Sequence, residues 1–329
     1  MEKRVVFTYI CVLFLLLASC AGNNEGKNSD IWEMQPVYGE CDTVAIDTMD
    51  VGNPFIVYDR KSDFYYMAGD NGYVWKSKGL DVWVGPYNVL DYDTATWLGT
   101  SPVITSPEIH KFANKYYYMA TFENSGNHSC TTLVADSITG PYRTIDSNSV
   151  LLDMNEKGAF PTFCIDDFDA GYMVYSRLGE QECEGTVQVV RYNDNFARRL
   201  GEAFEMFTAS QIPWLQEYCE VEVPVLKSPC VFNSGKNGLG ILFVAGGSKG
   251  KAVGVAYSES GTLNGPWVVE NEPLLDGCNS VSLFSDYDGT VVLVVDKDAV
   301  VDGVVKSVPE LIKTDTQFDK LQIKGNYKF

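Results

Sequence analysis

Apolar and polar positions alternate along most of this chain in short runs that are typical of β-strands. Two apolar runs flank a polar turn in "NPFIVYDRKSDFYYMAG", which begins at Asn53, and in "SPEIHKFANKYYYMATF", which begins at Ser106. Similar units begin at Phe160, Val223 and Asn279. Each is read as a strand, a turn rich in Asp, Asn, Gly or Lys, and a second strand rich in Tyr and Val. The pattern therefore predicts a repeated all-β unit.

The repeat has a nearly constant length. The prolines at the unit starts, Pro54, Pro107, Pro161 and Pro224, are 53, 54 and 63 residues apart. Three units end with related phrases, "KSKGLDVWVGPY", "ADSITGPY" and "SESGTLNGPW". Five all-β units with almost no helical periodicity predict a five-bladed β-propeller of four-stranded sheets. Because the first strand of each blade lines the central channel, we expect positions 53, 108, 160, 222 and 278 to face each other at one mouth.

The first twenty residues have the features of an exported lipoprotein. A basic start precedes an apolar run, from Val5 to Ala18, that is too short to span a bilayer as a helix. The run ends in Leu-Ala-Ser-Cys, which resembles the lipobox of bacterial lipoproteins and would make Cys20 the lipidated first residue. An ordinary secretory signal, in which Cys20 has no special role, is the alternative.

These features divide the chain into three parts. We predict a signal peptide over residues 1–19, a flexible polar tether over 20–40 and the propeller over 41–329. The protein is then exported and held at the membrane by its lipid alone, on the periplasmic side or at the cell surface.

The charge and composition of the chain disfavour several classes of function and of metal site. The net charge of −19 disfavours nucleic-acid binding, which needs clustered Lys and Arg. Nine cysteines become seven once Cys11 is cleaved off and Cys20 is lipidated, so at least one thiol stays unpaired. With two histidines and no CxxC motif, we expect no zinc site of the Cys/His kind. The Asp-rich pairs "DYDT" and "DDFDAG" fit hairpin turns rather than calcium loops.

Taken together, "GNPFIVYD", "SPEIHKFANKYYYMATF", "YSESGTLNGPW" and "CNSVSLFSDYDG" resemble glycoside hydrolase family 43, over roughly residues 47–329. These are five-bladed propellers that hydrolyse arabinosides, xylosides and related glycans. The resemblance implies an oligosaccharide or polysaccharide partner and an inverting mechanism, in which base and acid lie about 6.5–9.5 Å apart. A third carboxyl orients the acid and keeps its pKa high.

Only one of the three carboxyls implied by the resemblance is found. Glu222, in "CEVEVPVLK", occupies the acid position. The base position holds Asn53, whose amide does not ionise, and the pKa-modulating position holds Phe160. Cys278 stands where the family commonly has a His beside a channel ion, so we expect no cofactor and no calcium or sodium ion.

Other residues are candidates for a displaced base or for sugar contacts. Asp47, Asp50, Asp70 and Glu108 are carboxylates near the unit starts, and Glu108 matches an acidic substrate contact of the family's second blade. His110 lies on the same strand face as Glu108, where it binds a sugar hydroxyl or is simply structural. Trp75, Trp97 and Trp214 are candidate sugar platforms, with core packing as the alternative for each.

Three hypotheses follow. The first is a lipid-anchored glycosidase for arabinose-, xylose- or galactose-type glycans, with Glu222 as its acid and an unconventional base. The second is a glycan-binding pseudoenzyme that keeps the pocket without hydrolysis. The third is a propeller used as a protein-interaction scaffold. In each case we expect a monomer.

Overall fold

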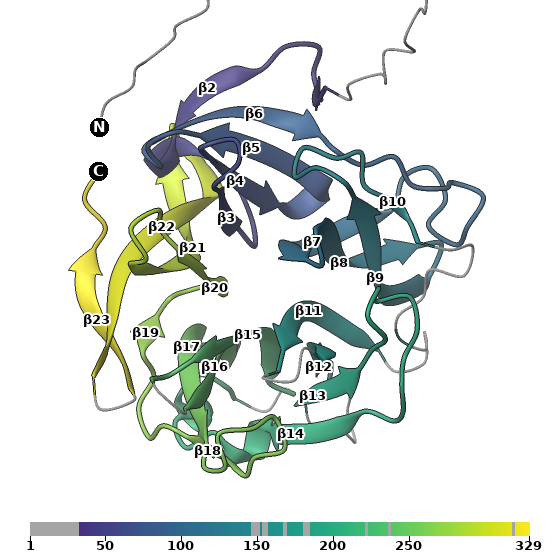
Figure 1. Ribbon diagram of the computed structural model, residues 1–329. Coiled ribbons are helices and arrows are strands. Elements are labelled where there is room, and N and C mark those ends of the chain that lie inside the picture. Colours follow the sequence, from purple (N-terminus) through teal and green to yellow (C-terminus); the bar gives the residue numbers. More distant parts are fainter. Residues whose placement is uncertain are drawn as a thin grey trace, which may run out of the picture. The chain divides into compact units, whose positions relative to one another are not determined.

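The chain forms five antiparallel sheets around a common centre (Figure 1). A computed structural model describes residues 33–145, 152, 157–166, 170–179, 185–220, 223–235, 238–317 and 320–329. The folded unit covers Trp32–Phe329. Within these described residues the helical elements are short 3-10 turns, and none is long and apolar enough to cross a membrane. The predicted five-bladed propeller is confirmed.

Each blade is one sheet built from consecutive strands. Blade 1 contains β3 (Phe55–Asp59), β4 (Phe64–Gly69), β5 (Tyr73–Ser77) and β6 (Val82–Asn88), with β1 (Gln35–Pro36) and β2 (Asp42–Ala45) paired to β6. Blade 2 contains β7 (Val103–Phe112), β8 (Lys115–Asn124), β9 (Asn127–Ala135) and β10 (Arg143–Thr144). Blade 3 contains β11 (Gly158–Ile165), β12 (Gly171–Arg177), β13 (Thr186–Arg191) and β14 (Phe204–Thr208).

The last two blades continue the pattern. Blade 4 contains β15 (Val225–Asn233), β16 (Leu239–Gly247), β17 (Gly250–Ser258) and β18 (Trp267–Val269), and β19 (Leu275–Asp276) pairs with β17. Blade 5 contains β20 (Ser280–Ser285), β21 (Val291–Val301), β22 (Val304–Gln317) and β23 (Lys320–Asn326). Strands β3, β7, β11, β15 and β20 are innermost (Figure 1).

Apolar packing between neighbouring blades holds the ring together. Five buried clusters lie at the five junctions between successive blades, the last of which joins blade 5 to blade 1. Both faces of every sheet are therefore buried against a neighbour. This explains why β16, which has a neighbouring strand on each side within its sheet, is almost continuously apolar instead of alternating.

The related closing phrases share one contact. Trp83 Nε1 donates to the Leu80 carbonyl at 2.8 Å, and Trp267 Nε1 donates to the Leu263 carbonyl at 3.0 Å. Tyr142 occupies the same place in blade 2 and donates to the Ile138 carbonyl at 3.0 Å. Each ring is buried while its polar atom is satisfied by local backbone, and all three rings belong to the clusters that pack between blades.

The predicted tether contains structure at its end. Strand β1 pairs with β6, and the Val37 amide donates to the Pro86 carbonyl at 3.0 Å. Tyr38 then hydrogen-bonds Tyr73. The propeller therefore begins before residue 41. The rest of the tether, the signal peptide and Cys20 lie outside the described residues.

Candidate functional site

Four of the inner strands start with the same local backbone. Asn53, Ser106, Phe160 and Ser228 each precede a proline and have φ between 50° and 54°. In blades 2, 3 and 4 the pairing register shifts at this step, as in a β-bulge. Together with Ser280 of blade 5, these residues line a narrow cavity at the centre of the ring. We call these five residues the inner ring.

The blade-4 member of the inner ring is Ser228, a residue that the sequence analysis missed. Strand β15 begins at Val225 and shifts register between Lys227 and Cys230, so the bulge falls on Ser228 and Pro229. The sequence pattern instead predicts a unit start at Val223 and Pro224, and this prediction is wrong. Glu222 lies outside the described residues, so its role stays a prediction.

Asn53 binds a carboxylate rather than facing the centre with an unengaged amide. Its Nδ2 donates to Asp70 Oδ1 at 3.0 Å and to Asp70 Oδ2 at 2.9 Å. The Ser106 amide donates to Asp70 Oδ1 at 2.9 Å, so this carboxylate connects blades 1 and 2. Gly52 leaves room for it, since a Cβ there would lie 2.5 Å from Asp70 Oδ2. Burial raises the pKa of Asp70, and the two donors offset this only in part.

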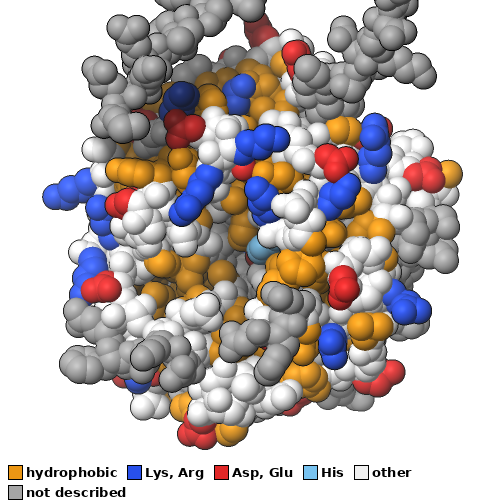
Figure 2. All heavy atoms as spheres, in the orientation of Figure 1, with side chains coloured by type: hydrophobic (Ala, Val, Ile, Leu, Met, Phe, Trp, Pro, Cys, Tyr) orange, Lys and Arg blue, Asp and Glu red, His pale blue; other side chains and the backbone are white. Residues whose placement is uncertain are grey.

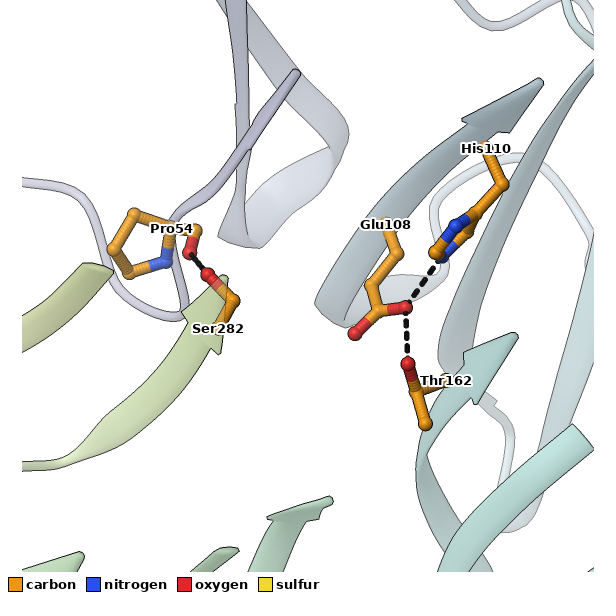
Figure 3. Close-up of polar contacts among 5 residues, drawn as sticks. All are labelled: Pro54, Glu108, His110, Thr162 and Ser282. Atoms are coloured by element: carbon orange, nitrogen blue, oxygen red, sulfur yellow. Dashed lines mark hydrogen bonds and ion pairs between the residues drawn. The ribbon is translucent and has the colours of Figure 1, made fainter. Parts of the chain in front are cut away.

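Glu108 lies beside the inner ring and is held from two blades. Its Oε2 is 2.6 Å from His110 Nε2 and accepts a hydrogen bond from Thr162 Oγ1 at 2.8 Å. Its other oxygen points toward the channel, opposite Pro54 and Ser282 (Figure 3). The His110 ring packs between Phe55 and Phe163. Glu108 and His110 share a strand face, as predicted, and His110 positions Glu108.

A wider cleft, of about 680 Å³, opens beside the inner ring and shares Asn53 with it. We call it the mouth cleft. Blade 1 supplies an aromatic wall of Tyr38, Tyr73 and Trp75, in which Tyr38 is 71% exposed. The charged lining side chains are Asp50, Asp70, Asp296, Lys227 and Lys251. The space-filling view shows the centre of the ring hollowed (Figure 2).

The mouth cleft has residues that the sequence did not single out. Tyr38 lies in the predicted tether, and Tyr73 lies between the repeated phrases of the first unit. Lys227, Lys251 and Asp296 come from blades 4 and 5, far from Asn53 in sequence. The one available signal was that Lys227 immediately precedes an inner-ring residue.

Burial argues against two of the predicted site residues as sugar contacts. Trp214 is 4% exposed and stacks on Phe243 in the cluster between blades 3 and 4. Cys278 is 0% exposed in the cluster between blades 4 and 5, and it does not line the inner-ring cavity. Trp97 is partly buried and packs against the cluster between blades 1 and 2, and its role as a sugar platform stays a prediction. These side chains pack because a propeller buries both faces of each sheet. Trp75, although 7% exposed, does line the mouth cleft.

The channel ion implied by the family resemblance would find few charged ligands among the described residues of the inner-ring cavity. Glu108 is the sole carboxylate among the described residues that line the inner-ring cavity, and His110 and Thr162 already engage it. Across the described part of the chain, no group of three or more His, Cys, Asp or Glu is arranged to hold a metal. The lining residues also supply neutral oxygens, and Ser106 Oγ, Ser228 Oγ and Asn53 Oδ1 have no hydrogen-bond partner among the described residues, but the group of carboxylates that usually binds a hard cation is missing.

Solved structures share this fold. An endo-arabinase from Bacteroides thetaiotaomicron is 21% identical, with 86% of this chain and 99% of that chain covered and a TM-score of 0.74. An endo-1,4-β-xylanase from the same organism is 17% identical, with 85% and 96% covered and a TM-score of 0.69. An α-L-arabinanase from Cellvibrio cellulosa is 14% identical, with 84% and 96% covered and a TM-score of 0.60.

Sequence comparison assigns the family directly. No curated protein matches the chain. The family model described as Glycosyl hydrolases family 43 matches residues 45–300, which is well over half of the sequence. The match includes all five inner-ring residues and most of the mouth-cleft residues, and it ends within β21 of blade 5. The chain therefore belongs to glycosyl hydrolase family 43.

Proposed function

We propose that this chain is an exported, lipid-anchored member of the family that binds a glycan in the mouth cleft and does not cleave it by the usual inverting mechanism. The observation that carries this proposal is the composition of the inner ring. Asn53, Phe160 and Ser228 occupy the positions before proline in blades 1, 3 and 4, and none can exchange a proton as a carboxyl does.

The mouth cleft has the properties of a sugar site. Its volume of about 680 Å³ lies within the range of small-molecule pockets, about 300–1,000 Å³. Tyr38 and Tyr73 offer ring surface for the C–H face of a sugar, while Asn71 supplies an amide for hydroxyl groups. Related folds that act on arabinan and xylan make arabinose- and xylose-type oligosaccharides the first ligands to try.

Calorimetric titration with arabino- and xylo-oligosaccharides tests the proposal. We expect saturable binding, and recovery of the sugar uncut after long incubation. Tyr38→Ala should weaken binding about tenfold, because one lost stacking contact corresponds to about 1–2 kcal/mol. Shortened sugars whose formation is lost on mutation of the mouth cleft would refute non-hydrolytic binding. The anchor is tested separately: Cys20→Ala should move the protein from the membrane fraction to the soluble fraction.

The properties of Asp70 support a second candidate function. In this function, carboxyl groups at positions other than the usual ones of the family hydrolyse the glycan. Burial and the charge of Asp296 raise the pKa of Asp70, as a general acid requires, and Asp70 lines the mouth cleft. The sequence-based version of this hypothesis assigns the acid to Glu222. If hydrolysis is found, Glu222→Gln and Asp70→Asn distinguish the two, since the true acid is needed most for substrates with poor leaving groups.

A further inference from the structure

Two lysines of blade 4, Lys227 and Lys251, line the mouth cleft and have N–H donors without an acceptor among the described residues. Lys251 Nζ donates to Asn279 Oδ1 at 3.2 Å. Lys227 Nζ lies 5.6 Å from the centre of the Phe160 ring and makes no hydrogen bond or ion pair with any residue that the structure describes. An ammonium group carries three N–H donors, so most of this donor capacity is unused.

The carboxylates of the cleft are already engaged by other donors. Asp70 accepts from Asn53 and from the Ser106 amide. Asp296 accepts from the hydroxyls of Ser280 and Ser307. Asp50 accepts from the Ser307 amide at 3.0 Å. Among the described residues, no carboxylate forms a direct ion pair with either lysine, although three carboxylates line the same cleft.

The surroundings of Lys227 disfavour its charged form. Burial lowers the pKa of Lys227, and the nearby charge of Lys251 lowers it further, whereas Asp296 and Asp70 act in the opposite direction. An anion bound by both ammonium groups would remove their mutual repulsion and satisfy their free donors. A neutral sugar hydroxyl would satisfy a donor but would leave the repulsion.

We propose that the mouth cleft recognises an acidic glycan, whose anionic group, a uronic acid carboxylate or a sulfate ester, is bound by Lys227 and Lys251. This inference rests on the proposed function and specifies its ligand class. The aromatic wall of Tyr38 and Tyr73 contacts the sugar ring, and the lysines select its charge. With a net charge of −19 the protein repels polyanions in general. Binding of an acidic glycan therefore depends on the local positive charge of Lys227 and Lys251.

The test compares ligands that differ only in charge. Trigalacturonate and its fully methyl-esterified form share one skeleton, and galactose 6-sulfate is compared with galactose. We expect wild type to bind each acidic sugar about tenfold or more tightly than its neutral partner, as a charge-assisted hydrogen bond allows. Added salt should weaken binding of the acidic ligands and leave the neutral ligands unchanged.

Variants assign the preference to the lysine pair. Lys227→Met and Lys251→Met should each reduce the acid-to-ester ratio by about tenfold while leaving the ester affinity within about twofold. Lys249→Met is the matched control, because Lys249 is an exposed lysine two residues from Lys251 and lies outside the cleft. If Lys227→Met fails to fold, Lys251→Met and the comparison of acidic and neutral ligands with wild type still test whether the cleft selects the anionic group.

The outcomes separate this inference from the proposed function. Equal binding of acid and ester by wild type overturns the acidic-glycan assignment and leaves glycan binding intact. Binding of inorganic sulfate as tightly as galactose 6-sulfate also overturns it, because the sugar would then contribute nothing. If the acidic sugars, their neutral partners and the arabino- and xylo-oligosaccharides all fail to bind, the proposed function fails as well.

Discussion

Asn53 is explained by the carboxylate that it contacts. Both oxygens of Asp70 lie within 3.0 Å of Asn53 Nδ2, in a place where burial already raises the pKa of that carboxyl. An amide donates where a carboxylate would only accept. In this chain the side chain at position 53 therefore acts as a hydrogen-bond donor that stabilises Asp70, which is incompatible with acting as a general base.

Asn53→Asp should destabilise the fold in a pH-dependent way. Two carboxylates would face each other at hydrogen-bond distance, so the pKa of the pair rises and one proton is shared. Stability is then lost as pH rises through this raised folded-state pKa, and is recovered as pH falls. Urea denaturation should show a loss of about 2–3 kcal/mol near neutral pH and a smaller loss at about pH 5.

The reciprocal change is the control for this prediction. In Asn53→Asp/Asp70→Asn one amide again faces one carboxylate, so most of the lost stability should return near neutral pH. An Asn53→Asp single variant whose stability follows the wild-type pH profile would show that the contact with Asp70 contributes little.

At the scale of elements, Glu108 joins two inner strands. It lies on β7 and accepts from Thr162 on β11, so one buried hydrogen bond links blades 2 and 3. Thr162→Val keeps the shape and removes the donor. We expect a loss of about 1.5–3 kcal/mol in the free energy of unfolding, because the acceptor is charged and buried. Urea denaturation measures it.

Blade 3, which contains Thr162, also provides a matched control. Thr186, on β13, is also buried, and its hydroxyl has no partner among the described residues. Thr186→Val should therefore leave stability unchanged or raise it slightly. Equal effects of the two substitutions would mean that the bond to Glu108 adds nothing to stability.

The elements were predictable where local pattern decides them. Paired strands with a proline at their start repeat through blades 1 to 3, and the hairpins follow from their turn residues. Blade 4 was placed incorrectly because Val223-Pro224 and Ser228-Pro229 lie five residues apart and both fit the pattern. Only the pairing of β15 with β16 shows which step carries the bulge.

The site was less predictable than the fold. Asn53, Phe160 and Glu108 were found because each stands at or next to a repeated proline. Lys227 and Asp296 reach the mouth cleft from blades 4 and 5, and no local pattern gives that convergence. A tryptophan such as Trp214 has the same sequence signature whether it packs in a core or stacks on a sugar, so burial had to decide.

At the scale of the whole molecule, the junction of blades 5 and 1 joins segments that are far apart in the chain. No strand of the described residues crosses from one sheet into the next, so this junction depends on packing and on single hydrogen bonds. The Val51 amide donates to the Ser307 carbonyl at 2.7 Å, and Ser282 Oγ donates to the Pro54 carbonyl at 2.9 Å (Figure 3).

Asp286 is a buried acidic residue of this junction. Its two oxygens accept from the hydroxyls of Tyr65 on β4 and of Tyr327 near the C-terminus, the second at 2.6 Å, and it is buried. Asp286→Asn removes the charge and one acceptor, so we expect a loss of about 2–3 kcal/mol. Because the blades are stable only as a closed ring, we expect the variant to unfold in a single transition. The midpoint of that transition should lie at a lower urea concentration than in wild type.

Separate removal of the two hydroxyls shows whether the loss arises at the junction. Tyr65→Phe breaks a contact between blades, whereas Tyr327→Phe breaks one between the C-terminal segment and its own blade. If Asp286 closes the ring, Tyr65→Phe should account for most of the loss, and combining it with Asp286→Asn should add less than the sum. Asp302→Asn, in an exposed turn of blade 5, should stay within about 0.5 kcal/mol of wild type. Full additivity of Tyr65→Phe and Asp286→Asn would instead mean that the two residues stabilise the propeller independently.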